Sequence, residues 1–248
     1  MGKDKFEAKA ATLPNRMGKD RSTLSYEEYL EGTRAILKKS QENGTPYIAM
    51  VAGREFLVYP NVFSPKYFND TELFAEHLPV RKDSELLEIG PGTGAVSITA
   101  LYKGAGRVVA IDINPDAVRN TQENIKKHAF SDKMDVREGD LYDGLKEGEK
   151  FDAIFWNTPF GLVQEPQLTD LEKAVWDVGY RSTERFVKEA SQHLKPGGKL
   201  YIGFSSTLGK IDLLTKFAKE AGYRLVTIYE AESTEIHPVR FEIFEAIK

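Results

Sequence analysis

Residues 85–95, ELLEIGPGTGA, decide the fold because they join three local patterns in one short stretch. The apolar run ending at Ile89 predicts a buried strand, a glycine-rich turn follows it, and the apolar residues after the turn favour a helix. Gly90, Gly92 and Gly94 permit positive φ angles and let a ligand approach the main chain closely. The turn therefore predicts a nucleotide-binding loop, and its G-x-G-x-x-A spacing also suits a dinucleotide.

Beyond this stretch, strand-like and helical runs alternate, which is typical of a parallel sheet with helices on both faces. Strands are expected at residues 85–89, 107–113, 134–137, 151–156 and 199–204, and helices at residues 95–102, 115–128, 169–194 and 211–221. The runs 223–232 and 239–247 leave no room for a helix between them, so they should pair antiparallel. The sequence thus predicts an α/β fold that binds its ligand at the carboxyl ends of the parallel strands.

The chain divides into an N-terminal tail and helix at residues 1–45 and a main domain at residues 46–248. The polar segment at residues 1 to about 22 predicts a flexible arm. Ser25 and Glu28 then form a capping box that opens a helix. Apolar side chains at helical spacing follow, so this helix can either pack on the main domain or cover a substrate as a lid.

Composition limits the classes of function. The 34 Lys and Arg residues and 38 Asp and Glu residues give a net charge of −4, whereas proteins dedicated to duplex DNA usually have a strong basic excess. Nucleic acid is therefore the less favoured partner. The absence of cysteine excludes disulfides and thiolate metal sites, and we expect no metal. With no apolar run long enough for a membrane span and no secretory signal, a cytoplasmic protein is expected.

Two aspartates follow the second and third predicted strands. Asp112 can accept hydrogen bonds from both hydroxyls of a ribose, which nicotinamide cofactors and S-adenosylmethionine both present, or it can cap the next helix. Asp140 can accept from the exocyclic amine of adenine, although an ordinary turn also uses such an acid. Their neighbours Ile113 and Leu141 are expected to contact the same nucleoside.

Glu88, immediately before the glycine turn, separates these two cofactors. Its negative charge would repel a pyrophosphate but attract a positive amino group, such as that of the methionine end of S-adenosylmethionine. Glu88 together with Asp112 and Asp140 therefore favours S-adenosyl-L-methionine over NAD.

The fourth predicted strand ends in the corner Asn157, Thr158, Pro159 and Phe160. This corner resembles the Asn-Pro-Pro-Tyr/Phe motif of class I methyltransferases that methylate a planar nitrogen, among them adenine amino-methyltransferases and release-factor glutamine methyltransferases. The resemblance implies that Asn157 accepts from the target NH2 group beside the cofactor, that Pro159 stiffens the loop and that Phe160 stacks on the substrate. Thr158 stands where the family usually has its first proline, which leaves the target group open.

The resemblance also implies the class I fold, which is Rossmann-like with seven mostly parallel strands and an antiparallel C-terminal pair. Further landmarks of the release-factor glutamine methyltransferases lie upstream, where PYI (46–48), GREF (53–56), VFSP (62–65) and TEL (71–73) follow the family's order. In that family this region covers the cofactor, which implies that Thr71 lies near its methionine end. Asp70 is expected to cap a short helix there.

These features predict an S-adenosylmethionine-dependent N-methyltransferase that acts on a planar amide, guanidine or amine nitrogen of a protein glutamine or a small molecule. Two acceptors that hold the N–H groups would orient the nitrogen lone pair and favour the positive charge that develops there. Three alternatives remain. They are an adenine amino-methyltransferase acting on RNA or DNA, an NAD-dependent oxidoreductase, and a non-catalytic partner module that resembles a methyltransferase.

Overall fold

The computed structural model describes residues 25–42, 44–164, 167–233 and 239–248. At its centre is a seven-stranded sheet with the strand order β10-β11-β9-β6-β3-β4-β5. The strands are β3 (Glu85–Ile89), β4 (Arg107–Asp112), β5 (Met134–Glu138), β6 (Phe151–Asn157), β9 (Leu194–Phe204), β10 (Arg224–Ser233) and β11 (Val239–Ile247). Only β11 runs against its neighbours in this sheet. The expected class I sheet, with its antiparallel C-terminal pair, is confirmed.

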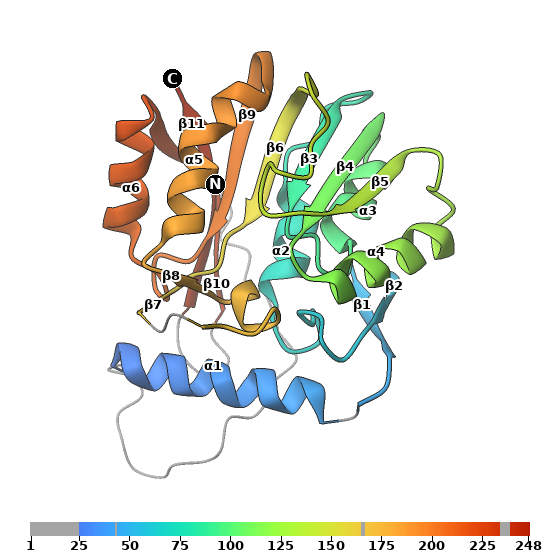
Figure 1. Ribbon diagram of the computed structural model, residues 1–248, viewed down its shortest axis with the longest axis vertical. Coiled ribbons are helices and arrows are strands. Elements are labelled where there is room, and N and C mark those ends of the chain that lie inside the picture. Colours follow the sequence, from blue (N-terminus) through green and yellow to red (C-terminus); the bar gives the residue numbers. More distant parts are fainter. Residues whose placement is uncertain (1–24, 43, 165–166, 234–238) are drawn as a thin grey trace.

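Helices cover both faces of the sheet (Figure 1). One face carries α2 (Asp70–His77), α3 (Ala95–Tyr102) and α4 (Pro115–Lys127), and the other carries α5 (Arg181–His193) and α6 (Ile211–Glu220). Successive strand residues point to opposite faces of the sheet. Leu86 packs in the core beneath α2, α3 and α4, and Leu87 packs in the core beneath α5 and α6. Because both faces are buried, the strands read as continuous apolar runs instead of alternating ones.

The segment ahead of the sheet forms a hairpin, with β1 (Tyr47–Val51) antiparallel to β2 (Arg54–Val58). The predicted capping box opens α1 (Tyr26–Gln41). Its apolar stripe does not pack on the main sheet. It contacts the segment around β7 (Gly161–Val163) and β8 (Trp176–Val178), where Leu37 joins a core with Val163 and Trp176. Figure 1 shows α1 lying beside these short strands. The arm predicted before Ser25 lies outside the described residues.

The long helix expected at residues 169–194 is wrong in its first half. This segment contains a 3-10 turn, η1 (Glu172–Ala174), then β8, and it becomes helical only at α5. Two residues with positive φ, Gly179 at +64° and Tyr180 at +55°, turn the chain between β8 and α5. Asp177 then accepts hydrogen bonds from the backbone N–H groups of Ser182 and Thr183 and so starts the helix. Parallel pairing with β7 explains why β8 is extended.

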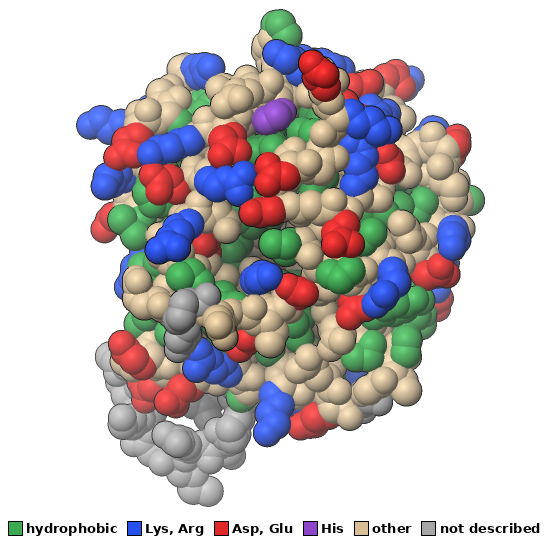
Figure 2. All heavy atoms as spheres, viewed as in Figure 1, with side chains coloured by type: hydrophobic (Ala, Val, Ile, Leu, Met, Phe, Trp, Pro, Cys, Tyr) green, Lys and Arg blue, Asp and Glu red, His purple; other side chains and the backbone are tan. Residues whose placement is uncertain are grey.

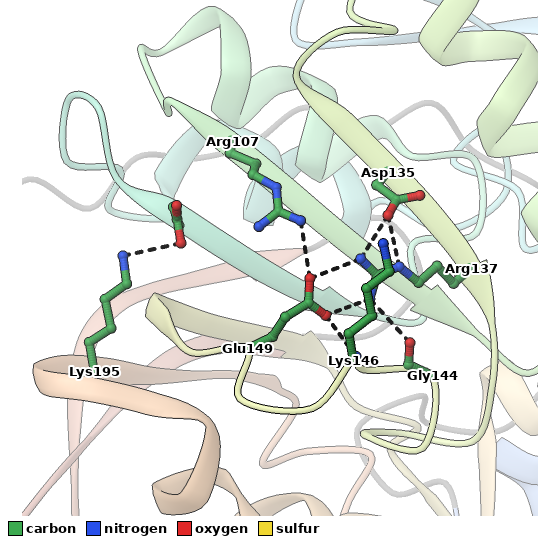
Figure 3. Close-up of polar contacts among 8 residues, drawn as sticks. Arg107, Asp135, Arg137, Gly144, Lys146, Glu149 and Lys195 are labelled. Carbon is green, nitrogen blue, oxygen red and sulfur yellow. Dashed lines mark hydrogen bonds and ion pairs between the residues drawn. The ribbon is translucent and has the colours of Figure 1, made fainter.

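The loop that follows β5 carries Asp140 and Leu141, and an ion-pair network closes it (Figure 3). The Glu149 carboxylate lies between two arginines, 2.6 Å from Nη1 of Arg137 and 3.1 Å from Nη2 of Arg107. The Arg137 guanidinium lowers the pKa of Glu149 to about 2. Both arginines lie on strands of the sheet, so the network anchors the far end of this loop to the core.

The face of the molecule drawn in Figure 2 carries acidic and basic side chains that are interspersed over the surface. Such mixing gives no extended field of one sign on that face. Among the described residues, none of the helices is both long enough and apolar enough to cross a membrane.

Candidate functional site

A cavity of about 300 Å³ lies at the carboxyl ends of β3, β4 and β6. That volume is at the lower end of the range of small-molecule sites, roughly 300–1,000 Å³. Ten of the residues predicted from the sequence line it: Thr71, Glu88, Gly90, Gly92, Asp112, Ile113, Asp140, Leu141, Asn157 and Pro159. The structure therefore brings the glycine turn, the two strand-end aspartates and the Asn157 corner to one place. Gly94 and Phe160 are not among the lining residues.

The glycine turn depends on backbone conformations that other residues rarely adopt. Gly90 has a φ of +61°, and a Cβ atom at this position would lie 3.0 Å from Nε1 of Trp156. The carbonyl of Gly92 accepts a hydrogen bond of 2.9 Å from the Thr121 hydroxyl on α4. Gly94 faces that same threonine, since a Cβ there would lie 3.0 Å from Cγ2 of Thr121. Gly94 thus lets the loop pack closely on α4, which explains its place outside the cavity.

Among the buried carboxylates that line the cavity, Glu88 and Asp112 form no salt bridge within the described residues. Asp112 accepts hydrogen bonds from the backbone N–H groups of Gly92 and Asn114, over 3.1 and 2.9 Å. Glu88, which is 2% exposed, accepts one from the Ser97 hydroxyl. Burial raises the pKa of Asp112 to about 6 and that of Glu88 to about 7. Carboxylates held this way fit a ligand that brings its own hydroxyl and ammonium donors, as S-adenosylmethionine does.

The cap of α4 is Asn114, whose side chain accepts a 2.9 Å hydrogen bond from the backbone N–H of Asp116. Asp112 is therefore not the residue that caps this helix. Asp140 also lines the cavity, but one of its oxygens accepts from Nη1 of Arg185 at 3.0 Å. Arg185, on α5, has no signal in the sequence that would link it to this loop.

The corner at residues 157–160 is held by hydrogen bonds of Thr158, one of which proline could not form. The backbone N–H of Thr158 donates to the carbonyl of Gly203 on β9 over 3.1 Å, and its hydroxyl donates to the same carbonyl over 2.9 Å. Proline has no N–H, so the first of these bonds depends on the departure from the family's motif. Thr158 thereby extends the pairing of β6 with β9 past Asn157.

Asn157 itself is bound on one side only. Its Nδ2 donates to Oδ2 of Asp70 over 2.8 Å, whereas its buried Oδ1 has no partner. A buried amide oxygen without a donor costs free energy, about 1–3 kcal/mol. Because Asn157 lines the cavity, its unpaired oxygen fits a donor that belongs to a bound molecule.

The ring of Phe160 packs against Phe204 and Phe241, with ring centroids 5.9 and 6.0 Å apart. Its carbonyl accepts a hydrogen bond from the Tyr180 hydroxyl. The main chain of the corner is thus fixed by the residue that immediately precedes α5. The stacking of Phe160 on a substrate stays a prediction.

Two parts of the site escaped sequence reasoning. Asp70 was expected to cap α2, but the cap position is Asn69, without a side-chain hydrogen bond, and Asp70 is the first helical residue. Its carboxylate is turned to Asn157 instead. The second part is the wall formed by residues 168–182, which the helical pattern obscured. The one sequence signal that singles out Asp70 is the Asp-Thr-Glu run that precedes the glycine turn.

Comparison with known proteins identifies the family. The model of the methyltransferase small domain family matches residues 53–224. A putative protein N5-glutamine methyltransferase of Methanocaldococcus jannaschii is 32% identical over 182 residues, which are 72% of this chain and 89% of the relative. The release factor glutamine methyltransferase of Aquifex aeolicus is 31% identical over 219 residues, covering 77% of this chain and 76% of the relative.

Solved structures agree on the fold. The 16S rRNA N2 G1207 methyltransferase of T. thermophilus, in complex with AdoMet and guanosine, has a TM-score of 0.59 and 24% identity over 82% of this chain and 50% of the other. The family match does not favour an NAD-dependent oxidoreductase or a non-catalytic module. This chain belongs to the methyltransferase small domain family and is an N-methyltransferase that uses S-adenosylmethionine as its methyl donor.

Proposed function

We propose that this enzyme methylates the side-chain amide nitrogen of a glutamine residue in a protein. The observation that carries the proposal is the buried, unpaired Oδ1 of Asn157, a residue that lines the cavity. It needs an N–H donor, and a primary amide has two. Relatives at 31–32% identity whose names specify protein glutamine as the target support a protein acceptor over a free small molecule.

An amide nitrogen is a poor nucleophile because its lone pair is delocalised into the carbonyl. Asn157 Oδ1 would accept from one N–H of the substrate and hold the nitrogen in line with the methyl group. The same contact would favour the positive charge that develops on nitrogen as the N–CH3 bond forms and the S–CH3 bond of the donor breaks, which would leave the donor as a neutral thioether. The nitrogen then loses one proton to water.

The remaining predicted residues would hold the methyl donor. Glu88 would bind its ammonium group and Asp112 its ribose hydroxyls, and both line the cavity. The positive φ angles at Gly90 and Gly92 would let the ligand approach the main chain closely. When bound, the donor supplies an electrophilic methyl group on a sulfonium. We assign Thr71, Ile113, Asp140 and Leu141 to the same ligand, since all four line the cavity.

We further infer that residues 46–248 form the methyltransferase domain and that residues 1–45 are an extension serving the acceptor side. Tyr26 on α1 supports this, because its hydroxyl bonds both the N–H and the carbonyl of Leu162, two residues beyond the corner at Phe160. By contacting this loop, α1 contributes to how the acceptor is held.

The test is methyl transfer from labelled S-adenosylmethionine to a panel of purified release factors and ribosomal proteins, with free glutamine and RNA alongside. The proposal predicts label on one protein, located by mass spectrometry on a glutamine and lost when that glutamine is changed to glutamate. Label confined to RNA or to a free metabolite would contradict it.

A further inference from the structure

Behind Asn157 lies a second buried group that the reaction as described does not use. Asp70 is 3% exposed, and its Oδ2 accepts the 2.8 Å hydrogen bond from Nδ2 of Asn157. Its other oxygen, Oδ1, is buried without a partner. Asp70 forms no salt bridge within the described residues. The backbone N–H groups of the first turn of α2 favour its charged form, but burial of a carboxylate whose side-chain partner is an amide is costly to the fold.

The pair has a built-in polarity. An amide side chain has a donor end and an acceptor end of nearly equal shape, so packing alone does not decide which end faces which way. An ionised carboxylate only accepts hydrogen bonds. Next to Asp70, Asn157 must therefore present its NH2 group to the carboxylate, and its Oδ1 necessarily points elsewhere.

Asp70 acts from outside the cavity. Asn157 and Thr71 line the cavity, but Asp70 does not. It contacts Asn157 and not the space where a substrate would bind. Asp70 is thus unsuited to touch the reacting atoms, and its influence on the reaction has to pass through the Asn157 amide.

Both partners are on rigid elements. Asp70 opens α2, whose Phe74 is fully buried and packs edge-on against Phe155 of β6. Asn157 ends β6, and its Cα lies 3.2 Å from where a Cβ of Gly203 would be. With both backbones fixed, the orientation of the amide is the remaining freedom, and Asp70 removes it.

We propose that Asp70 is a positioning residue, which locks Asn157 in the single amide orientation that presents Oδ1 to the acceptor nitrogen. The inference rests on the proposed function for the identity of the acceptor, but not for the orientation of the amide. A flipped Asn157 would offer its NH2 group to the substrate NH2 group, and two donors cannot form a hydrogen bond with each other.

The experiment compares three variants with wild type. Asp70→Asn keeps the shape but lets either end of Asn157 face residue 70. Asn157→Asp places two carboxylates against each other. The exchange variant combines Asp70→Asn with Asn157→Asp. Residue 70 then supplies the NH2 donor, and the carboxylate at position 157 can only accept hydrogen bonds. If Asp70 positions Asn157, kcat falls about 100-fold in Asp70→Asn. The kcat of the exchange variant should then be about tenfold higher than that of Asp70→Asn. A change of this size is within the range of coupling energies between residues in contact.

Binding of S-adenosylhomocysteine should be unchanged in Asp70→Asn, which separates positioning from loss of the fold. The side-chain amide signals of Asn157 in a ¹⁵N–¹H spectrum give a readout independent of any substrate. They should be shifted and protected from exchange in wild type and lose both properties in Asp70→Asn. An unchanged amide signal, or wild-type kcat in Asp70→Asn, would overturn the inference. If the signals change as expected while no glutamine is methylated, only the proposed acceptor is wrong.

Discussion

The backbone N–H of Gly92 donates a hydrogen bond to the Asp112 carboxylate across 3.1 Å, which joins the glycine turn to the end of β4. The second carboxylate oxygen accepts from the N–H of Asn114. Asp112 is thus oriented before any ligand binds, and the same residue shapes the turn at Gly92. Loop and carboxylate form one preorganised unit.

Replacing Asp112 by alanine should therefore weaken cofactor binding without preventing folding. Loss of hydrogen bonds to a charged group costs about 1.5–3 kcal/mol, which corresponds to roughly a 10- to 150-fold higher Kd. Calorimetric titration with S-adenosylhomocysteine measures it. Asp212→Ala, which removes an exposed aspartate on α6, is the matched control and should leave the Kd unchanged. Equal affinities for the two variants would show that Asp112 does not bind the cofactor.

Gly90→Ala should be more damaging than an alanine at another glycine with positive φ. Gly90 combines a φ of +61° with a Cβ position 3.0 Å from Trp156, whereas Gly148 has a φ of +78° and open space around it. Backbone strain alone costs about 1–3 kcal/mol. Urea unfolding should show a larger loss of stability for Gly90→Ala than for Gly148→Ala, and only the first should weaken S-adenosylhomocysteine binding.

Cofactor affinity should fall as the pH is lowered. Burial raises the pKa of Glu88 to about 7 and that of Asp112 to about 6, and in the proposed site each binds the cofactor as a carboxylate. Protonation as the pH drops through this range removes the attraction for the ammonium group. Titrations with S-adenosylhomocysteine across this range should show a rising Kd, and Glu88→Gln should flatten the upper part of the curve. A Kd independent of pH in wild type would contradict this.

The stability of the ligand-free protein should change in the opposite sense. The folded pKa of Glu88 lies above its ordinary value of 4.5. The folded protein therefore binds more protons, so this group's contribution is fully present below 4.5 and is lost as the pH rises through about 7. Thermal unfolding of wild type and Glu88→Gln should diverge as the pH rises, with the variant the more stable near neutral pH.

The Tyr26 hydroxyl links α1 to the loop beyond the corner at residues 157–160 through both backbone groups of Leu162. Tyr26→Phe should remove these bonds, which are worth about 0.5–1.5 kcal/mol each, and loosen the loop. We expect a higher KM for the acceptor protein with an unchanged Kd for S-adenosylhomocysteine. Glu31→Gln, which changes an exposed residue on the same helix, is the comparison variant. An unchanged KM for the acceptor protein in Tyr26→Phe would show that this contact of α1 serves packing and does not help to hold the acceptor.

Local pattern predicted most of the fold. The strand at residues 85–89 and the helix at residues 95–102 match the structure, because a buried apolar run, glycines and a helix start follow one another directly. The segment around Trp176 was misassigned, since its extended form depends on pairing with β7 and not on its own residues. Asp70 was missed as a partner of Asn157 because the two are 87 residues apart in sequence. Contacts of this kind have no local signal.

The central claim is that Asn157 holds the acceptor nitrogen, and transfer of labelled methyl by Asn157→Ala at saturating S-adenosylmethionine tests it most directly. We predict that the variant binds S-adenosylhomocysteine as wild type does but transfers no methyl group to the glutamine of its protein substrate. Wild-type turnover in Asn157→Ala would contradict the account.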